Sequence, residues 1–156
     1  MKNFFIKYKY GFISAAFIIL VSVLGGVFVR MGDDFFSTVT KPTQWVPDFV
    51  FAVVWTLIYV IYAVTFFHFS GEGLLDKKLV FIGLINGLLN VLWCLVYFAL
   101  GNSFGGIVII IINAFFATVL AKLIIEKGQK LTFLCWLYPL WLYLATALNL
   151  AVWILN

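Results

Sequence analysis

The stretch that decides the fold is KPTQWVPDFVFAVVWTLIYVIYAVTF, residues 41–66. It opens as a loop in which Pro42 and Pro47 fix their own φ and bias the residues before them away from the α region. After Pro47 the sequence predicts an apolar helix whose aromatic residues recur at spacings of four, four, three and four. Those spacings place one set of rings on a single helix face: Phe51, Trp55, Tyr59, Tyr62 and Phe66. A helix that is apolar on every side is buried in protein or lies in lipid, and the aromatic face is typical of core packing.

The composition of the whole chain favours lipid. Of its 156 residues, 65% are hydrophobic and 10% are charged, whereas about a quarter are charged in soluble domains. Five apolar runs of 19 to 25 residues, each long enough for a helix to cross roughly 30 Å of hydrocarbon, occupy residues 11–29, 47–69, 79–100, 105–125 and 131–155. The first run is longer than a signal-peptide core of roughly 7–15 residues and has no A-x-A cleavage site, so we expect it to be retained. The sequence therefore predicts an all-α integral membrane protein, with residues 1–156 forming one five-helix bundle.

The lysine and arginine residues predict the orientation of this bundle. With five spans, eight of the ten basic residues fall on the side of the N-terminus: Lys2, Lys7, Lys9, Lys77, Lys78, Lys122, Lys127 and Lys130. Arg30 and Lys41 fall on the other side. By the positive-inside rule, the N-terminus lies in the cytoplasm and the C-terminus outside, in a multi-pass protein of the cell membrane. The net charge of +4 follows from this topology and implies no nucleic-acid partner.

The third run carries polar residues on one helix face. Asn86, Asn90, Trp93 and Tyr97 follow one another at spacings of four, three and four. An amide that faces hydrocarbon without a partner costs several kcal/mol, so we expect both asparagines to face the bundle interior. Two interpretations stay open: the amides form hydrogen bonds between helices, or they orient a polar group of a ligand.

Small residues occur at two places where a neighbouring helix or another group could pack closely. Gly83 and Gly87 have a small-xxx-small spacing that permits close approach of another helix, which is compatible with a homodimer. In the last run, Trp141, Ala145 and Asn149 align at spacings of four, and a large ring beside a small residue leaves a recess. The run at 105–125 carries a ridge of alanines and is expected to be structural.

The connection from residue 31 to residue 46 is the longest in the chain. Links between helices commonly have about two to eight residues, so this one is long enough to have its own structure. It ends in Trp45 and Val46 on the predicted outer side. We weigh a lid that folds over the bundle equally against a mobile, solvated loop.

Residues typical of enzymatic or metal chemistry are missing from the apolar runs. No Asp or Glu occurs within residues 49–71, 79–125 or 131–156, which argues against a proton- or sodium-coupled transporter. His68 is the sole histidine, and Cys94 and Cys135 are expected to be small apolar fillers. We therefore expect no metal site and no cofactor, and neither conventional hydrolysis nor phosphoryl transfer.

Four motifs occur in order along these runs: K-P-x-x-W-x-P before the second helix, V-W-x-x-x-Y within it, N-x-x-x-N-x-x-W in the third, and W-x-x-x-A-T-x-L-N in the fifth. Together they resemble the TspO family, the tryptophan-rich sensory proteins, whose mitochondrial relatives are the translocator proteins or peripheral-type benzodiazepine receptors. The resemblance covers residues 35–149, which is 149 − 35 + 1 = 115 of 156 positions.

The resemblance implies a five-helix bundle, usually dimeric, with a pocket between the helices under the first loop. Members of the family bind porphyrins, and several bind sterols or isoquinoline-type ligands. Carried over by motif, the residues that line or border the pocket are Pro47, Trp55, Tyr59, Asn86, Asn90, Trp93, Trp141 and Ala145. Asn86 stands where the family often has Gln.

Three functions follow as hypotheses. The first is a membrane protein that binds porphyrins or similar flat hydrophobic molecules in sensing, handling or transport, with Arg30 or Lys41 near a ligand carboxylate. The second, also implied by the resemblance, is photo-oxidative breakdown of the bound porphyrin with the participation of Trp55 and Trp141. The third is a structural or regulatory membrane protein with an empty aromatic core.

The sequence departs from the family pattern in three places. The loop tryptophan, Trp45, is displaced by one position and one proline is lost after it. The order Pro-Tyr in the fifth helix is reversed to Tyr138-Pro139. The C-terminal cholesterol motif is missing, since residues 148–155 contain no Tyr and no basic residue, and this argues against specific sterol binding.

Overall fold

The computed structural model describes residues 2–42 and 46–156, and within those ranges five helices are long and apolar enough to span a membrane. Their elements are α2 (Lys9–Met31), α4 (Asp48–Gly71), α5 (Lys77–Cys94) continued by the π-helix η1 (Leu95–Ala99), α6 (Ser103–Ile125), and the 3₁₀-helix η2 (Thr132–Trp136) continued by α7 (Leu137–Leu155). Two short helices, α1 (Lys2–Lys7) and α3 (Asp33–Thr38), flank the first span. The predicted all-α, five-span architecture is confirmed, and no predicted span differs from the observed one by more than two residues at either end.

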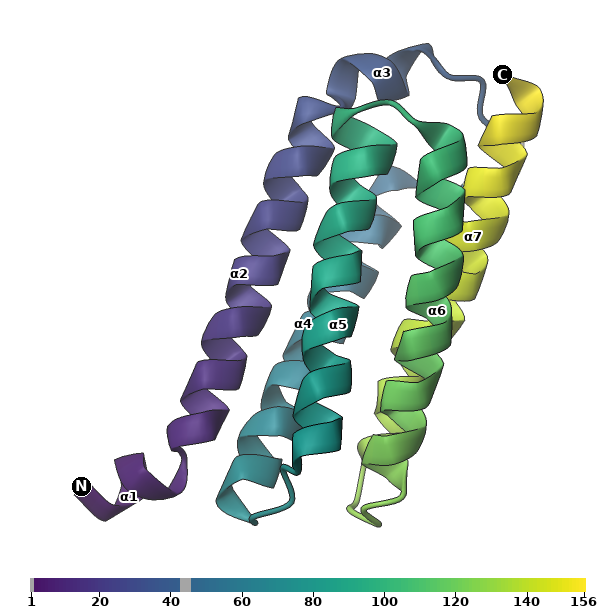
Figure 1. The fold of residues 1–156 in the computed structure, drawn as a ribbon. Helices are drawn as coiled ribbons and strands as arrows, with labels where there is room; N and C mark the ends of the chain where they lie inside the picture. Colours follow the sequence, from purple (N-terminus) through teal and green to yellow (C-terminus); the bar gives the residue numbers. More distant parts are fainter. Residues whose placement is uncertain (1, 43–45) are drawn as a thin grey trace.

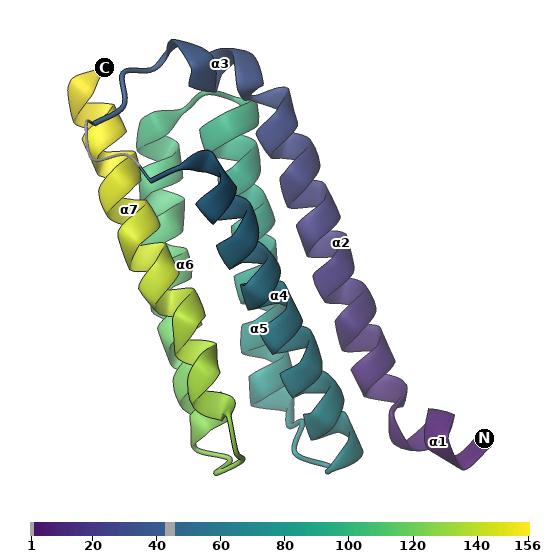
Figure 2. The same ribbon diagram turned by 180° about the vertical axis from the view of Figure 1, so that it is seen from behind.

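The five spans form a ring in the order α2, α4, α7, α6 and α5 (Figure 1). Figure 2 shows α4 in front, between α7 and α2. The N-terminus and the α4–α5 and α6–α7 connections lie at the lower end in Figure 1, and α3, the α5–α6 connection and the C-terminus lie at the upper end. The link between η1 and α6 is short, and α6 packs on α5 as its antiparallel neighbour.

The aromatic face of α4 points into the ring. Tyr62 and Phe66 are buried, and Trp55 is half-buried beside them. The opposite face of α4 presents exposed apolar side chains at every turn: Phe49, Val53, Leu57, Val60 and Val64. An exposed apolar face of this length is what a helix needs in order to face lipid, and the inward rings supply the core.

At the lower end, Asp76 connects the start of α5 to the segment that follows α6. Asp76 accepts a hydrogen bond from the backbone N–H of Leu79 at 2.8 Å and so caps the N-terminus of α5. Its carboxylate also pairs with Lys127, which follows α6. The hydrogen bond from Lys127, followed by that from Leu79, lowers the pKa of the Asp76 carboxyl below its usual value.

The first long connection crosses the upper end of the bundle (Figure 1). Within it, α3 lies against η1, and Gly32 is so close to Phe98 that a Cβ at this position would be 2.5 Å from the Phe98 backbone. Thr40 then binds the C-terminal residue in both directions: its N–H donates to Asn156 Oδ1 at 2.8 Å, and its carbonyl accepts from Asn156 Nδ2 at 3.1 Å. These contacts favour a loop that covers the bundle, whereas Trp45 lies outside the described residues.

The π-helix η1 changes the register at the upper end of the third span. The N–H of Leu100 donates to the carbonyl of Leu95 at 2.9 Å, five residues back, so this turn is wider than an α-turn. Such turns occur often at functional sites. The wide turn seats Tyr97, which is 1% exposed, against Gly106, where a Cβ would be 2.6 Å from its ring.

The α-helix α7 continues without interruption past Pro139. This proline lies in the first turn of α7, directly after η2, where a backbone N–H has no intrahelical partner to lose. Tyr138, directly before Pro139, lies in the interior and is 5% exposed.

Candidate functional site

Aromatic rings from α4, α5, η1 and α7 gather in the bundle interior. We call this set the aromatic cluster: Phe51, Trp55, Tyr59, Trp93, Tyr97, Tyr138 and Trp141. Trp55 joins the helices, since its ring centroid lies 5.7 Å from Tyr59, 6.1 Å from Trp93 and 5.9 Å from Tyr138. At these separations the rings are in direct aromatic contact, and most of the cluster is removed from lipid.

Trp93 is fixed by a hydrogen bond to the last span. With the Asn149 amide oriented to suit its neighbours, Asn149 Oδ1 accepts from Trp93 Nε1 at 2.9 Å. Asn149 Nδ2 then donates to the carbonyl of Ala145 at 3.3 Å. The predicted alignment of Ala145 and Asn149 on one face of α7 thus holds the Trp93 indole against that helix.

Trp141 has an unsatisfied polar atom. Its side chain is 7% exposed and its ring lies 5.3 Å from that of Phe51. The indole Nε1–H is buried and has no acceptor among the described residues, and the buried hydroxyl of Tyr97 is also without a partner there. Buried donors are almost always satisfied in folded proteins, so each of these groups calls for an explanation.

Below the aromatic cluster, a hydrogen-bonded polar network links four helices: Tyr59, Asn86, Asn90, Asn113 and Tyr138. Asn86 Nδ2 donates to Asn113 Oδ1 at 2.7 Å, and Asn113 Nδ2 donates to the Tyr138 hydroxyl at 3.2 Å. Asn90 Nδ2 donates to the same hydroxyl at 3.3 Å. Asn90 Oδ1 accepts from the Tyr59 hydroxyl, also at 3.3 Å. Asn86 and Asn90 are 3% and 2% exposed, so the prediction that they face the interior is confirmed.

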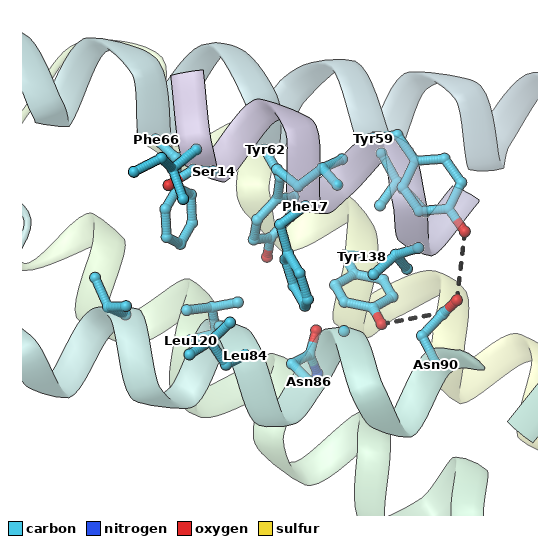
Figure 3. Close-up of a pocket in the computed structure, with 17 residues that line it drawn as sticks. Ser14, Phe17, Tyr59, Tyr62, Phe66, Leu84, Asn86, Asn90, Leu120 and Tyr138 are labelled. Atoms are coloured by element: carbon cyan, nitrogen blue, oxygen red, sulfur yellow. Dashed lines mark hydrogen bonds between the residues drawn. The ribbon is translucent and has the colours of Figure 1, made fainter. Parts of the chain in front are cut away.

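A cavity of about 210 Å³ lies beside this network, between α2, α4 and α5 (Figure 3). We call it the lower cavity, because its walls come from the lower half of α2 and from the facing parts of α4 and α5. Three of the predicted site residues line it, namely Tyr59, Asn86 and Asn90. The other five are not part of its wall: Trp55, Trp93, Trp141 and Ala145 lie in or beside the aromatic cluster, and Pro47 precedes α4 at the upper end.

Gly87 in the lower cavity allows two helices of the same chain to approach. A Cβ at Gly87 would lie 2.6 Å from the ring of Phe17 and 3.2 Å from Val21, both on α2. Gly83 faces Phe66 of α4 in the same way, at 3.2 Å. The predicted close approach at this glycine pair is therefore made within the chain, and a homodimer stays a prediction.

Two members of the polar network were not predicted from the sequence. Asn113 lies in α6, to which the alanine ridge assigned a purely structural role, and Tyr138 was noted for its reversed order with Pro139. Asn113 is 0% exposed. The signal that identifies it is the one applied to Asn86: a single amide in the middle of an apolar run has to find a partner.

The aromatic cluster and the polar network consist of uncharged residue types. A charged residue, Lys41, lies near them at the upper end of the bundle. Lys41 Nζ lies 4.2 Å from the ring centroid of Phe36, and that ring is 5.4 Å from Phe98. Phe98 is in turn 5.5 Å from Trp93. Among the described residues, no group of three or more His, Cys, Asp or Glu side chains is arranged to hold a metal ion.

Comparison with known proteins identifies the family. The model of the TspO/MBR family matches residues 14–154. The chain is 30% identical over 122 residues to the tryptophan-rich protein TspO of Archaeoglobus fulgidus, which covers 78% of this chain and 79% of that protein. It is 27% identical over 127 residues to protein CrtK of Rhodobacter capsulatus, which covers 78% of each chain. Five membrane spans around a buried aromatic cluster, together with these matches, show that the chain is a membrane protein of the TspO/MBR family.

Proposed function

We propose that this membrane protein binds a flat, conjugated hydrophobic molecule of the porphyrin class, in sensing, handling or transport. The ligand lies between α4 and α7, with the rings of Trp55, Tyr59, Trp93 and Trp141 against its faces and edges. Ala145 leaves room for it beside Trp141, and Pro47 lies at the mouth. Asn86 and Asn90 supply hydrogen bonds from below.

The packing of α4 supports a ligand at this seam. α4 packs along α2, whereas it meets α7 at few points. At the upper end the contact between them includes the ring pair of Phe51 and Trp141, whereas at the lower end Tyr62 of α4 donates to the carbonyl of Cys135 at 3.0 Å. A small outward movement of the upper half of α4 would separate Trp55 from α7 and open a slot whose walls are aromatic.

The observation that carries the proposal is the buried Nε1–H of Trp141, which has no acceptor among the described residues. A buried donor left unpaired costs about 1–3 kcal/mol. A carbonyl or carboxylate oxygen on a ligand would remove that cost. A wall of rings that contains an unpaired donor therefore suits a ligand that is apolar over its faces and polar at its edge.

The proposal includes an orientation. The lower end in Figure 1 carries most of the lysines and lies in the cytoplasm, and the upper end with α3 lies outside. Lys41 at the upper end is then placed to pair with an acidic group at the edge of the ligand.

A titration of the purified protein with a porphyrin tests this function. We expect saturable quenching of tryptophan fluorescence together with a shift of the porphyrin Soret band, because ligand and indoles are in contact. A structural protein with a closed aromatic core would give neither signal beyond that of empty detergent micelles, and that result would exclude the proposed function.

A further inference from the structure

The lower cavity presents polar atoms that the protein itself leaves without partners. Asn86 Nδ2 donates both to Asn113 Oδ1 at 2.7 Å and to the Asn113 carbonyl at 3.3 Å. A carbonyl cannot donate, so these contacts fix which end of the Asn86 amide is the nitrogen. The Asn86 oxygen then faces the cavity (Figure 3) and accepts no hydrogen bond from the described residues. It belongs to a side chain that is 3% exposed.

A donor lies next to this acceptor. The Tyr138 hydroxyl receives the N–H groups of Asn90 and Asn113, at 3.3 Å and 3.2 Å. Both contacts use the lone pairs of its oxygen, and its own hydrogen has no acceptor among the described residues. Tyr138 lines the lower cavity, and Figure 3 shows its hydroxyl beside Asn86 and Asn90. The wall thus offers one acceptor and one donor side by side.

The rest of the lower cavity selects for a neutral, apolar molecule. Among the residues that the structure describes, no charged side chain lines it, so an ionised group would be left unpaired inside the membrane. The Ser14 hydroxyl on the opposite wall already donates to the Tyr10 carbonyl of its own helix, at 2.8 Å. The remaining lining is almost entirely hydrocarbon and aromatic ring.

The size and the opening of the cavity limit the shape of the ligand. An apolar cavity of on the order of 150 Å³ holds a benzene molecule, so about 210 Å³ accommodates a short length of chain but no fused polycyclic skeleton. The rim carries Ile13 of α2 and Val80 and Leu84 of α5, which are 55%, 38% and 42% exposed. Figure 1 shows α2 leaning away from α5 toward this end. The opening therefore faces the lipid, and a chain can continue into the bilayer.

We propose that the lower cavity is a second binding site, for a neutral single-chain amphiphile whose hydroxyl or primary amide group reaches Asn86 and Tyr138. A hydroxyl or an amide both donates and accepts, so it satisfies the Asn86 oxygen and the Tyr138 hydrogen together. The ligand enters from the lipid between α2 and α5. This site goes beyond the proposed function, and it shares Tyr59, Asn86 and Asn90 with the porphyrin site without depending on it.

Photolabelling of the full chain in nanodiscs tests the proposal. The probe is dodecanol with a diazirine in its chain, and labelled residues are found by mass spectrometry. We expect saturable labelling of residues 13–21 and 80–90. Dodecanol and dodecanamide should compete about tenfold better than dodecyl methyl ether, because the ether accepts but does not donate to Asn86. Equal competition by the alcohol and the ether would show that the cavity takes up alkyl chains without recognising the head group. Absence of saturable labelling would show that the Asn86 oxygen and the Tyr138 hydroxyl bind water instead. Either result overturns the proposal.

Two glycine variants localise the site. Gly83→Leu places a side chain in the lower cavity, where the nearest atom to the new Cβ is the far end of the Phe66 ring at 3.2 Å. We expect it to abolish the labelling. Gly26→Leu is the matched control, because a Cβ at Gly26 would have no described atom within 4 Å, and it should label as the unmodified protein does. Persistent labelling of Gly83→Leu would overturn the assignment, and the head-group series in the unmodified protein decides the matter even if this variant does not fold.

A porphyrin titration separates this proposal from the proposed function. Gly83→Leu should bind porphyrin normally, and Trp141→Ala should still be labelled by the alcohol probe. If porphyrin does not bind but the alcohol probe labels the lower cavity, the porphyrin site is excluded and the lower-cavity site remains. If porphyrin binds but the probe does not label, the lower-cavity site alone is excluded.

Discussion

The side-chain amide of Asn86 donates a hydrogen bond to the side-chain oxygen of Asn113 across the α5–α6 interface, with 2.7 Å between nitrogen and oxygen. Both residues are buried, at 3% and 0% exposure. Because Asn113 also donates to Tyr138, these two bonds connect α5 to α7 through α6. The polar network is therefore an element of the architecture as well as the floor of the aromatic cluster.

The first prediction follows from these bonds. Asn113→Leu removes the side-chain acceptor of Asn86, leaving it the longer bond to the Asn113 carbonyl, and removes one donor to Tyr138. The loss of hydrogen bonds to buried groups costs about 1–3 kcal/mol. We expect a lower apparent Tm in detergent, measured by the loss of helical circular dichroism. Ile112→Leu is the control, since Ile112 is 43% exposed and faces lipid. Equal apparent Tm values for the two variants would mean that the network does not stabilise the bundle.

The second prediction concerns the role of individual tryptophans. Trp141→Ala should weaken porphyrin binding about two- to tenfold, because a stacked aromatic contact is worth about 0.5–1.5 kcal/mol beyond its burial. Trp153→Ala should bind normally, since Trp153 is 47% exposed and packs on Phe104 at the outer surface. The Soret titration measures both. Equal affinities would indicate that porphyrin adheres to the lipid-facing surface.

The third prediction uses the small side chain at Ala145. Ala145→Leu adds three carbon atoms to the space that we assign to the ligand, and overpacking costs roughly 1–3 kcal/mol, or about ten- to a hundredfold in affinity. The variant should purify as well as the unmodified protein but bind porphyrin and isoquinoline ligands poorly. Ala147→Leu, two positions along on the exposed face of α7, is the matched control. Normal binding by Ala145→Leu would remove this face of α7 from the site.

The fourth prediction is the orientation in the membrane. A cysteine introduced at Ser37 on α3 should react with impermeant thiol reagents from outside intact cells, and one at Lys77 should not. The native cysteines give little background, because Cys94 and Cys135 are 5% and 0% exposed. The reverse labelling pattern would overturn the orientation inferred from the lysines.

The fifth prediction is a pH dependence at the lower end. The pKa of Asp76 is lowered in the folded protein, chiefly by the hydrogen bond from Lys127, so the carboxylate stabilises the fold above its ordinary pKa. That contribution is lost as the pH falls from about 3.9, the ordinary value, through the folded pKa. The pair is half-exposed, so the charge contributes at most about 1 kcal/mol. Asp76→Asn keeps the helix cap, and it should reduce the difference in apparent Tm between acidic and neutral pH. An unchanged difference would show that the pH dependence comes from other groups.

The sequence predicts the spans because apolar length is a local property. The four- and three-residue spacings also predict which face of α4 and of the third span turns inward, and Tyr62, Asn86 and Asn90 lie there. The periodicity of a helix predicts which of its faces turns inward, but it does not predict which neighbouring helix packs against that face. The spacing of Gly83 and Gly87 is compatible with contact from a second protomer. In the structure, Phe17 of the same chain packs against Gly87. The partner of Asn86 and the place of the lower cavity depend in the same way on tertiary packing.

The polar network has an electrical consequence. In the described ranges, the buried polar side chains are asparagines and one threonine, and the network adds tyrosine hydroxyls, so its members are neutral. A membrane potential does work of about 2.3 kcal/mol per 100 mV on an elementary charge that crosses the bilayer, and none on a neutral group. Rearrangements of these buried side chains therefore move no gating charge of their own. The hydrogen bonds that this network offers to a neutral ligand are therefore not coupled directly to the membrane potential.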